Sequence, residues 1–260
     1  MASQFSLQAE ELGQSLGQWK VRGFHSLSYY IWGGLLSIFG ACVVLSSLKS
    51  LFNAEEVGVG VFACWGTFGL IVGGLGLAGG IKAFIERDLG VQVFSEGLIY
   101  TKSGKHTLVR WDDIAAVWQE ATTYKSYGVT TYTMRKFTIQ LQDGRKFRFD
   151  NIFEKVESLG ETIQNQVTKH QLPQAIQSLK KGATVSFGEK LAVSAQGLSN
   201  SNEIIPWSQV QSVRVNQGVI TVQKQGKWLN WSSVKVANTP NVFVFLALVE
   251  TILSSSHSPA

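Results

Sequence analysis

The chain has 260 residues, a formal net charge of +5 and a hydrophobic content of 45%. Its two cysteines both lie in apolar stretches, and its four histidines are scattered without ligand spacing. This composition excludes a disulfide framework and predicts no metal site. The excess of basic residues is too small to indicate nucleic-acid binding. We therefore expect no cofactor, no metal and no nucleic-acid partner.

Two uncharged stretches near the N-terminus are the strongest signal in the sequence. Residues 29–48 and residues 57–81 contain no charged side chain. At about 1.5 Å of rise per residue, a helix of either length spans the roughly 30 Å hydrocarbon core of a bilayer. Only residues 49–56 separate them, so we expect a hairpin of two transmembrane helices. Glycines with G-x-x-x-G spacing in the second stretch favour close packing against the first helix over a dimerisation face.

Basic residues flank the predicted hairpin on one side. Lys20 and Arg22 precede it and Lys82 and Arg87 follow it, whereas the connecting loop has one lysine and two glutamates. The positive-inside rule then places both termini in the cytoplasm, and we expect a multi-pass protein of the plasma membrane. The stretches also lack the ionisable residues that ion pathways need, which argues against a transporter or channel.

The remaining chain carries the same plan twice. Residues 93–98 match residues 193–198, residues 109–117 match residues 205–213, and residues 143–147 match residues 225–229. Each copy closes with a helical pattern. A duplicated module of this size predicts two domains of one fold.

Alternating apolar residues predict the register of one hairpin. In residues 137–141 and 147–149, every second side chain is apolar. Pairing these on one face requires an odd number of loop residues, so we predict a three-residue loop at residues 142–144 with Gly144 left-handed. By analogy, residues 224–226 should form the same loop in the second copy. Gly97 and Gly197 should each allow a bulge or a bend.

The closing helices differ between the copies. The first is amphipathic from Phe153 to Val167, and Pro173 should open a separate linker helix after it. The second, after Pro240, is apolar on all sides. One small domain cannot bury this whole surface. We therefore expect two parts of it to dock elsewhere: a second apolar stripe of the helix, which contains Phe243 and Leu248, and Trp228 on the outer face of the hairpin. The first copy is the favoured partner, and another subunit is the alternative.

Two short motifs recur in the same order in both copies. They are a Gly-Leu turn in residues 96–100 and 196–198, and a tryptophan step in residues 110–114 and 206–210. With the strands and the closing helix, they resemble the bacterial pleckstrin-homology-like domains. The whole chain resembles an uncharacterised bacterial membrane-protein family with two N-terminal spans ahead of such domains. The resemblance implies two tandem domains, each a strand-rich, partly open barrel closed by a C-terminal helix.

The expected fold class is thus a membrane α-hairpin followed by a mainly-β part. The predicted segments are a cytoplasmic N-terminal segment (1–28), transmembrane helix 1 (29–48), an external loop (49–56), transmembrane helix 2 (57–81), pleckstrin-homology-like domain 1 (91–170), a helical linker (171–183) and pleckstrin-homology-like domain 2 (184–255).

The resemblance also implies where ligands would bind. Such domains often bind lipid headgroups or proteins, and cations near a hairpin loop match phosphate oxygens. The headgroup candidates are Lys102, Lys105, His106 and Arg110. The candidates for a partner or interdomain contact are three tyrosines in a predicted hairpin extension (Tyr124, Tyr127 and Tyr132), Trp228 and Phe243. The second copy has Pro206 before its tryptophan and few basic residues, so we expect no headgroup site there.

No catalytic motif is present in the sequence, and we expect no catalytic residue. The leading hypothesis is a non-enzymatic, membrane-anchored binding or scaffold module that presents its tandem domains to a protein partner, a membrane assembly or another copy of itself. One alternative is a sensor of anionic lipid headgroups. A second alternative, an enzyme with an unrecognised site, has no supporting motif.

Overall fold

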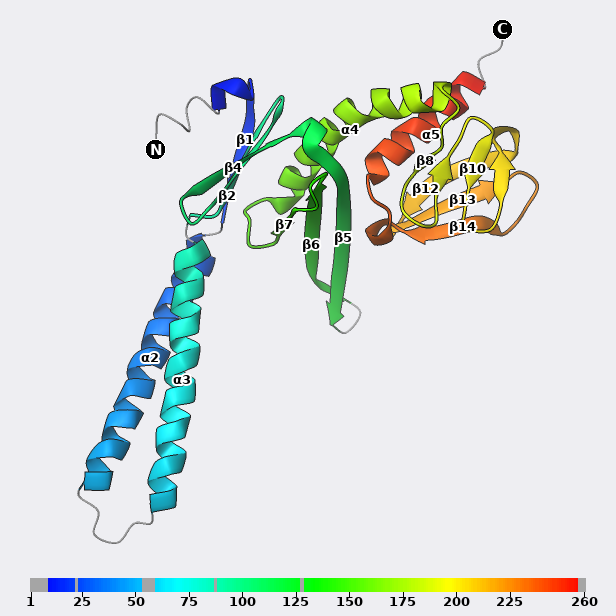
Figure 1. Cartoon of the computed structure of the whole chain (residues 1–260). Helices are drawn as coiled ribbons and strands as arrows, with labels where there is room; N and C mark the ends of the chain where they lie inside the picture. Colours follow the sequence, from blue (N-terminus) through cyan, green and yellow to red (C-terminus); the bar gives the residue numbers. More distant parts are fainter. Residues whose placement is uncertain (1–8, 22, 53–58, 87, 127–128, 257–260) are drawn as a thin grey trace. The chain divides into compact units, whose positions relative to one another are not determined.

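The computed structural model describes residues 9–21, 23–52, 59–86, 88–126 and 129–256 (Figure 1). The chain divides into two compact units. One comprises Lys20–Val91 and Tyr100–Thr107, and the other comprises Met1–Trp19, Gln92–Ile99 and Leu108–Ala260. Each unit is described by itself.

Two long helices, α2 (Gly23–Phe52) and α3 (Val59–Glu86), pack against each other. Their windows Tyr30–Lys49 and Cys64–Ile81 are long and apolar enough to cross a membrane. A Cβ added at Gly40 would lie 2.5 Å from the backbone nitrogen of Gly73, so the helix backbones touch. The predicted close packing of two apolar helices is therefore confirmed.

The first copy begins before these helices. Strand β1 (Ser15–Lys20) joins β2 (Gly90–Phe94), β3 (Gly97–Lys102) and β4 (Lys105–Arg110) in a four-stranded sheet of order β1-β2-β3-β4. Leu12, just before β1, is fully buried against Phe94 and Ile99. Residues 15–20, which the sequence assigned to an N-terminal segment, are thus a strand, and the helical hairpin is an insertion between β1 and β2.

The second sheet of this copy has order β5-β6-β7, from β5 (Ile114–Ser126), β6 (Val129–Leu141) and β7 (Lys146–Asp150). Ile139 pairs with Phe147 and Phe137 with Phe149. The Leu141 N–H donates to the Arg145 carbonyl at 2.9 Å, and Gly144 has φ +86°. The predicted register and three-residue loop are confirmed.

Helix α4 (Val156–Lys180) is continuous, with Pro173 in its interior. The prediction that Pro173 opens a separate linker helix is wrong. Leu159 and Ile163, in its first half, are fully buried, whereas Leu179, in its last turn, joins the core of the second copy. Burial at both ends offsets the lost hydrogen bond and the ring clash that an internal proline costs.

The second copy repeats this order: a four-stranded sheet, a three-stranded sheet and a helix. Only residues 187–191 join its first two strands, at the place where the first copy carries the helical hairpin. Within the described residues, the strands are antiparallel wherever their pairing is resolved, and they do not close into a barrel. Its elements are β8 (Val185–Ser186), β9 (Ala192–Val193), β10 (Gly197–Ser199), β11 (Ile204–Pro206), β12 (Val210–Asn216), β13 (Val219–Lys224), β14 (Asn230–Lys235) and α5 (Val242–Ser256).

The predicted three-residue loop at 224–226 is wrong. Strand β14 starts at Asn230, so residues 225–229 form the loop. The register shifts between Val222 and Gln223, and the Gln225 N–H is held by the Gln209 carbonyl at 2.8 Å. A shift in the pairing of the two strands changes whether an odd or an even number of loop residues keeps the apolar side chains on one face.

The two recurring motifs build the same feature in both copies. The indole N–H of Trp111 donates to the Ser95 carbonyl at 2.9 Å, and that of Trp207 donates to the Ser194 carbonyl at 3.0 Å. A Cβ at Gly97 would lie 2.3 Å from the Val109 carbonyl oxygen, and one at Gly197 only 1.9 Å from its counterpart on Ile205. A side chain at either position would collide with the neighbouring backbone. This close approach, and not the predicted bulge, explains why both positions are glycine.

Candidate functional site

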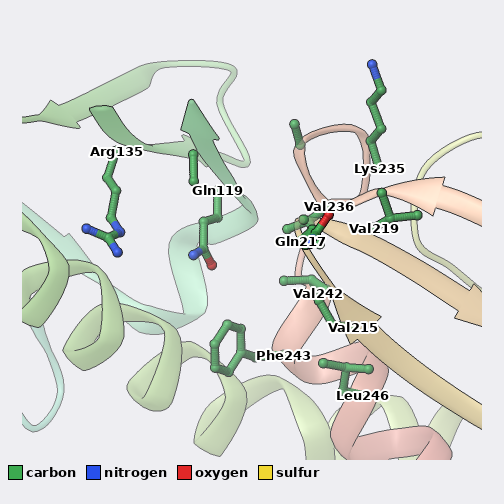
Figure 2. Close-up of a pocket in the computed structure, with 13 residues that line it drawn as sticks. Gln119, Arg135, Val215, Gln217, Val219, Lys235, Val236, Val242, Phe243 and Leu246 are labelled. Carbon is green, nitrogen blue, oxygen red and sulfur yellow. The ribbon is translucent and has the colours of Figure 1, made fainter. Parts of the chain in front are cut away.

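A groove of about 600 Å³ lies between the two copies (Figure 2). This size is typical of pockets that bind ligands. In Figure 2, Arg135 and Gln119 come from the first copy, Val219 and Lys235 come from the second, and Phe243 lies between them. The lining residues are Gln119, Ala121, Arg135, Val215, Gln217, Gly218, Val219, Lys235, Val236, Ala237, Val242, Phe243 and Leu246.

Asn241 joins the copies at one end of this groove. Its side-chain oxygen accepts a hydrogen bond from the Val117 N–H at 2.8 Å, and its amide donates to the Ala115 carbonyl at 3.1 Å. Its own N–H donates to the Val117 carbonyl at 2.8 Å. Asn241 has φ +51°, a conformation that asparagine tolerates better than most residues. The residue before α5 thus pairs with the outer edge of β5 much as a neighbouring strand would.

The edge of β5 continues from this joint into the groove. The pairing of β5 with β6 shows no register shift between Val117 and Thr123. Because backbone groups alternate along a strand, the N–H and C=O of Gln119 and Ala121 point to the same outer edge as those of Val117. Both residues line the groove. The groove therefore contains a strand edge that continues beyond the position taken by Asn241.

Apolar side chains of α5 and β12 form much of the remaining lining. Phe243 is 38% exposed and Val215 45% exposed, whereas Val242 is buried. Phe243 therefore borders the groove between the copies and is not fully covered by either. The prediction that Leu248 shares an outward stripe with Phe243 is wrong. Leu248 is fully buried in a cluster that includes Leu179, because the end of α4 covers that side of α5.

Polar groups lie on the wall formed by the first copy. The Gln164 side-chain amide donates to the Gln119 side-chain oxygen at 3.0 Å, and Gln164 is buried. Arg135 forms an ion pair with Glu157 and keeps about a third of its side chain exposed. On the opposite wall Lys235 is exposed and forms no ion pair with another described residue. The groove thus combines an apolar surface, two cationic side chains and an edge of β5 that pairs with no other described strand.

The structure divides the predicted headgroup residues. Lys102, Lys105 and His106 flank the turn between β3 and β4, but Arg110 ends β4. Arg110 pairs with Glu11. Headgroup binding by these four residues stays a prediction.

The predicted hairpin extension is present, with β5 and β6 each 13 residues long. Tyr124 and Tyr132 are cross-strand partners in its register. Their side chains lie outside the described structure, as does the whole of Tyr127. The tyrosine contact stays a prediction.

Trp228 lies in the loop between β13 and β14 and is fully exposed, with Leu229 83% exposed beside it. The expectation that Trp228 docks on the first copy is wrong, because the five-residue loop carries it away from the sheet surface. Its contact with a partner stays a prediction. A hollow of about 340 Å³ adjoins it, lined by Glu203, Lys224, Lys227, Trp228, Leu229 and Trp231.

The sequence did not indicate Asn241 or the open β5 edge as parts of a site. Helix α5 begins at Val242, directly after Asn241. The one available signal is an asparagine directly before an apolar helix, which is compatible with a left-handed residue. That signal does not reveal the partner strand 124 residues away.

The described chain is thus a β-rich protein with an inserted hairpin of apolar helices and a groove between its two structural repeats. Residues 1–258 match the model of a family of unknown function, DUF6585, and the chain belongs to this family. None of the curated proteins matches the sequence.

Proposed function

We propose that this protein is a non-enzymatic, membrane-anchored binding module that holds an extended segment of a protein partner in the groove between its domains. The main evidence for this proposal is the open edge of β5 at Gln119 and Ala121, which lies inside a groove of about 600 Å³. Helices α2 and α3 would anchor the module, because both are long and apolar enough to span a bilayer.

An open strand edge binds an extended peptide through main-chain hydrogen bonds, and nearby pockets select its side chains. Asn241 already bonds to β5 in this way at Val117. A partner strand would continue the same pairing at the next two outward-facing residues. The main chain would supply affinity that depends little on sequence.

Specificity would come from the lining. Phe243 and Val215 offer apolar contacts, and Arg135 and Lys235 add positive charge on either side. A complementary segment therefore alternates apolar and acidic residues, because opposite charges across an interface guide association and register.

The domain order supports an assignment of both copies as pleckstrin-homology-like. Each has four strands, then three strands, then a helix. Domains of this kind bind ligands and have no fixed catalytic role. The basic residues beside the helix ends favour a cytoplasmic location for both domains, with the two helices in the plasma membrane.

Replacing Ala121 with proline tests the strand edge. Proline removes the outward N–H but no hydrogen bond to β6, so the hairpin should keep its fold. A photo-crosslinking amino acid at Val215 of the full-length protein, in native membranes, should capture a partner in the parent chain and in Ala121→Val. Ala121→Pro should lose the crosslink. An equal yield in Ala121→Pro, or the same product from position 190 outside the groove, would contradict the proposal.

A further inference from the structure

One end of the first four-stranded sheet belongs to the same compact unit as the two apolar helices. This unit comprises Lys20–Val91 and Tyr100–Thr107. It contains α2 and α3, the last residue of β1, the first two of β2, the end of β3 and the start of β4.

The connections explain why these strand ends lie together. Two-residue connections join β2 to β3 and β3 to β4, and such short connections require antiparallel strands. The Ser95 N–H donates to the Gln14 carbonyl, so the start of β1 lies beside the end of β2. Strands β1 and β3 therefore run toward the helices. The turn after β3 lies at the sheet end where the chain enters α2 and leaves α3.

The turn itself has a defined shape. Ser103 has φ +51° and Gly104 has φ +72°, as in the tight turns that match the twist of a hairpin. Lys102 and Lys105 flank this turn as a cross-strand pair, with Cβ atoms about 4.5–5.5 Å apart. Like charges at this spacing repel each other. Both lysines are exposed, and neither forms an ion pair with another residue that the structure describes.

Further basic groups lie beside this turn in the chain or in the sheet. His106 follows Lys105 and shares a hydrogen bond with Thr101 at 2.9 Å between Nδ1 and Oγ1. Lys20 ends β1, three residues before α2 begins. In the sequence Arg22 precedes α2, and Lys82 and Arg87 lie near the end of α3. Acidic residues here are fewer, with Glu86 and Asp88 closest in the chain.

We infer that this cationic end, defined by Lys20, Lys102, Lys105 and His106, rests on the anionic lipid headgroups of the leaflet from which α2 and α3 emerge. The occupant is the bilayer surface, because the chain enters its apolar helices at this end of the sheet. Bridging phosphates would relieve the repulsion between Lys102 and Lys105. Basic residues are attracted to an anionic leaflet within about one Debye length, roughly 8–10 Å. This contact is separate from the peptide groove.

Lysine acetylation of the full-length protein in lipid nanodiscs tests the inference. Acetylation rates at each lysine are measured by mass spectrometry in discs of phosphatidylcholine alone and in discs that also contain phosphatidylglycerol. We expect Lys102 and Lys105 each to react about fivefold more slowly in the anionic discs. High salt should remove this protection, because it screens surface charge. Lys190, in the loop that replaces the helical hairpin in the second copy, should react equally in both.

A Lys102→Glu/Lys105→Glu variant provides a second measurement. It should lose the lipid-dependent protection of Lys20, whereas Lys190→Glu should retain it. Equal rates for Lys102 and Lys105 in both discs would overturn the inference. Protection by inorganic phosphate in phosphatidylcholine discs would also overturn it, by showing a site for free phosphate. A chain that fails to enter either disc would instead contradict the membrane anchor of the proposed function.

Discussion

Asn241 and Val117 are separated by 124 residues, and reciprocal hydrogen bonds of 2.8 Å join them. The side-chain oxygen of Asn241 accepts from the Val117 N–H, and the Val117 carbonyl accepts from the Asn241 N–H. These bonds connect the residue before α5 to the edge of β5. They define where the groove begins and which part of the edge stays open.

Replacing Asn241 with glycine should loosen this joint. Glycine retains the left-handed backbone but loses both side-chain hydrogen bonds, at a cost of about 1–2 kcal/mol. We expect faster hydrogen exchange of the Val117 amide, with little change in the core of the second copy around Leu198. Unchanged exchange at Val117 would show that these bonds do not hold the domains together.

Replacing Trp228 with alanine should leave the free energy of unfolding within about 0.5 kcal/mol of the parent value, because the indole is fully exposed. Phe245→Ala is the matched aromatic deletion. Phe245 is fully buried with its ring 5.2 Å from that of Phe187, so its loss should cost about 3–5 kcal/mol. Chemical denaturation measures both. Equal costs would mean that Trp228 is covered in solution.

Replacing Phe149 with aspartate should unfold the first copy, whereas Lys146→Asp should be tolerated. Phe149 is fully buried, with its ring centroid 5.7 Å from that of Phe153, and an unpaired buried charge costs several kcal/mol. Lys146 is exposed on the opposite face of the same strand. Similar melting temperatures for the two variants would reject the register of β6 and β7.

Asp143 should titrate at a lower pH than an ordinary aspartate. Hydrogen bonds from the backbone N–H and then the guanidinium of Arg145 lower the pKa of its carboxyl group. The stabilisation from this depressed pKa is present above the unfolded pKa and is lost as the pH falls through the folded pKa. NMR titration measures the shift, and Arg145→Ala should raise the pKa toward its ordinary value. The variant keeps the backbone N–H at position 145, so an unchanged pKa would exclude only the guanidinium as a cause.

Features that depend on local periodicity could be predicted from the sequence. The two apolar helices follow from uninterrupted apolar stretches, and the pairing of Ile139 with Phe147 follows from period-two alternation. The duplicated tryptophan step likewise predicted two copies of one plan. In each case a short segment contains the whole signal, because its own side-chain pattern specifies which face is buried.

Other features were decided by contacts between distant segments. Strand β1 has only Trp19 buried and shows no alternation, so its place beside β2 depends on tertiary packing. Helix α4 passes through Pro173 because Leu179 reaches the second core. The joint at Asn241 needs an edge of β5 that lies far away in the chain. Backbone hydrogen bonds and burial across such separations depend on how the elements meet in space, which no local pattern of residues specifies.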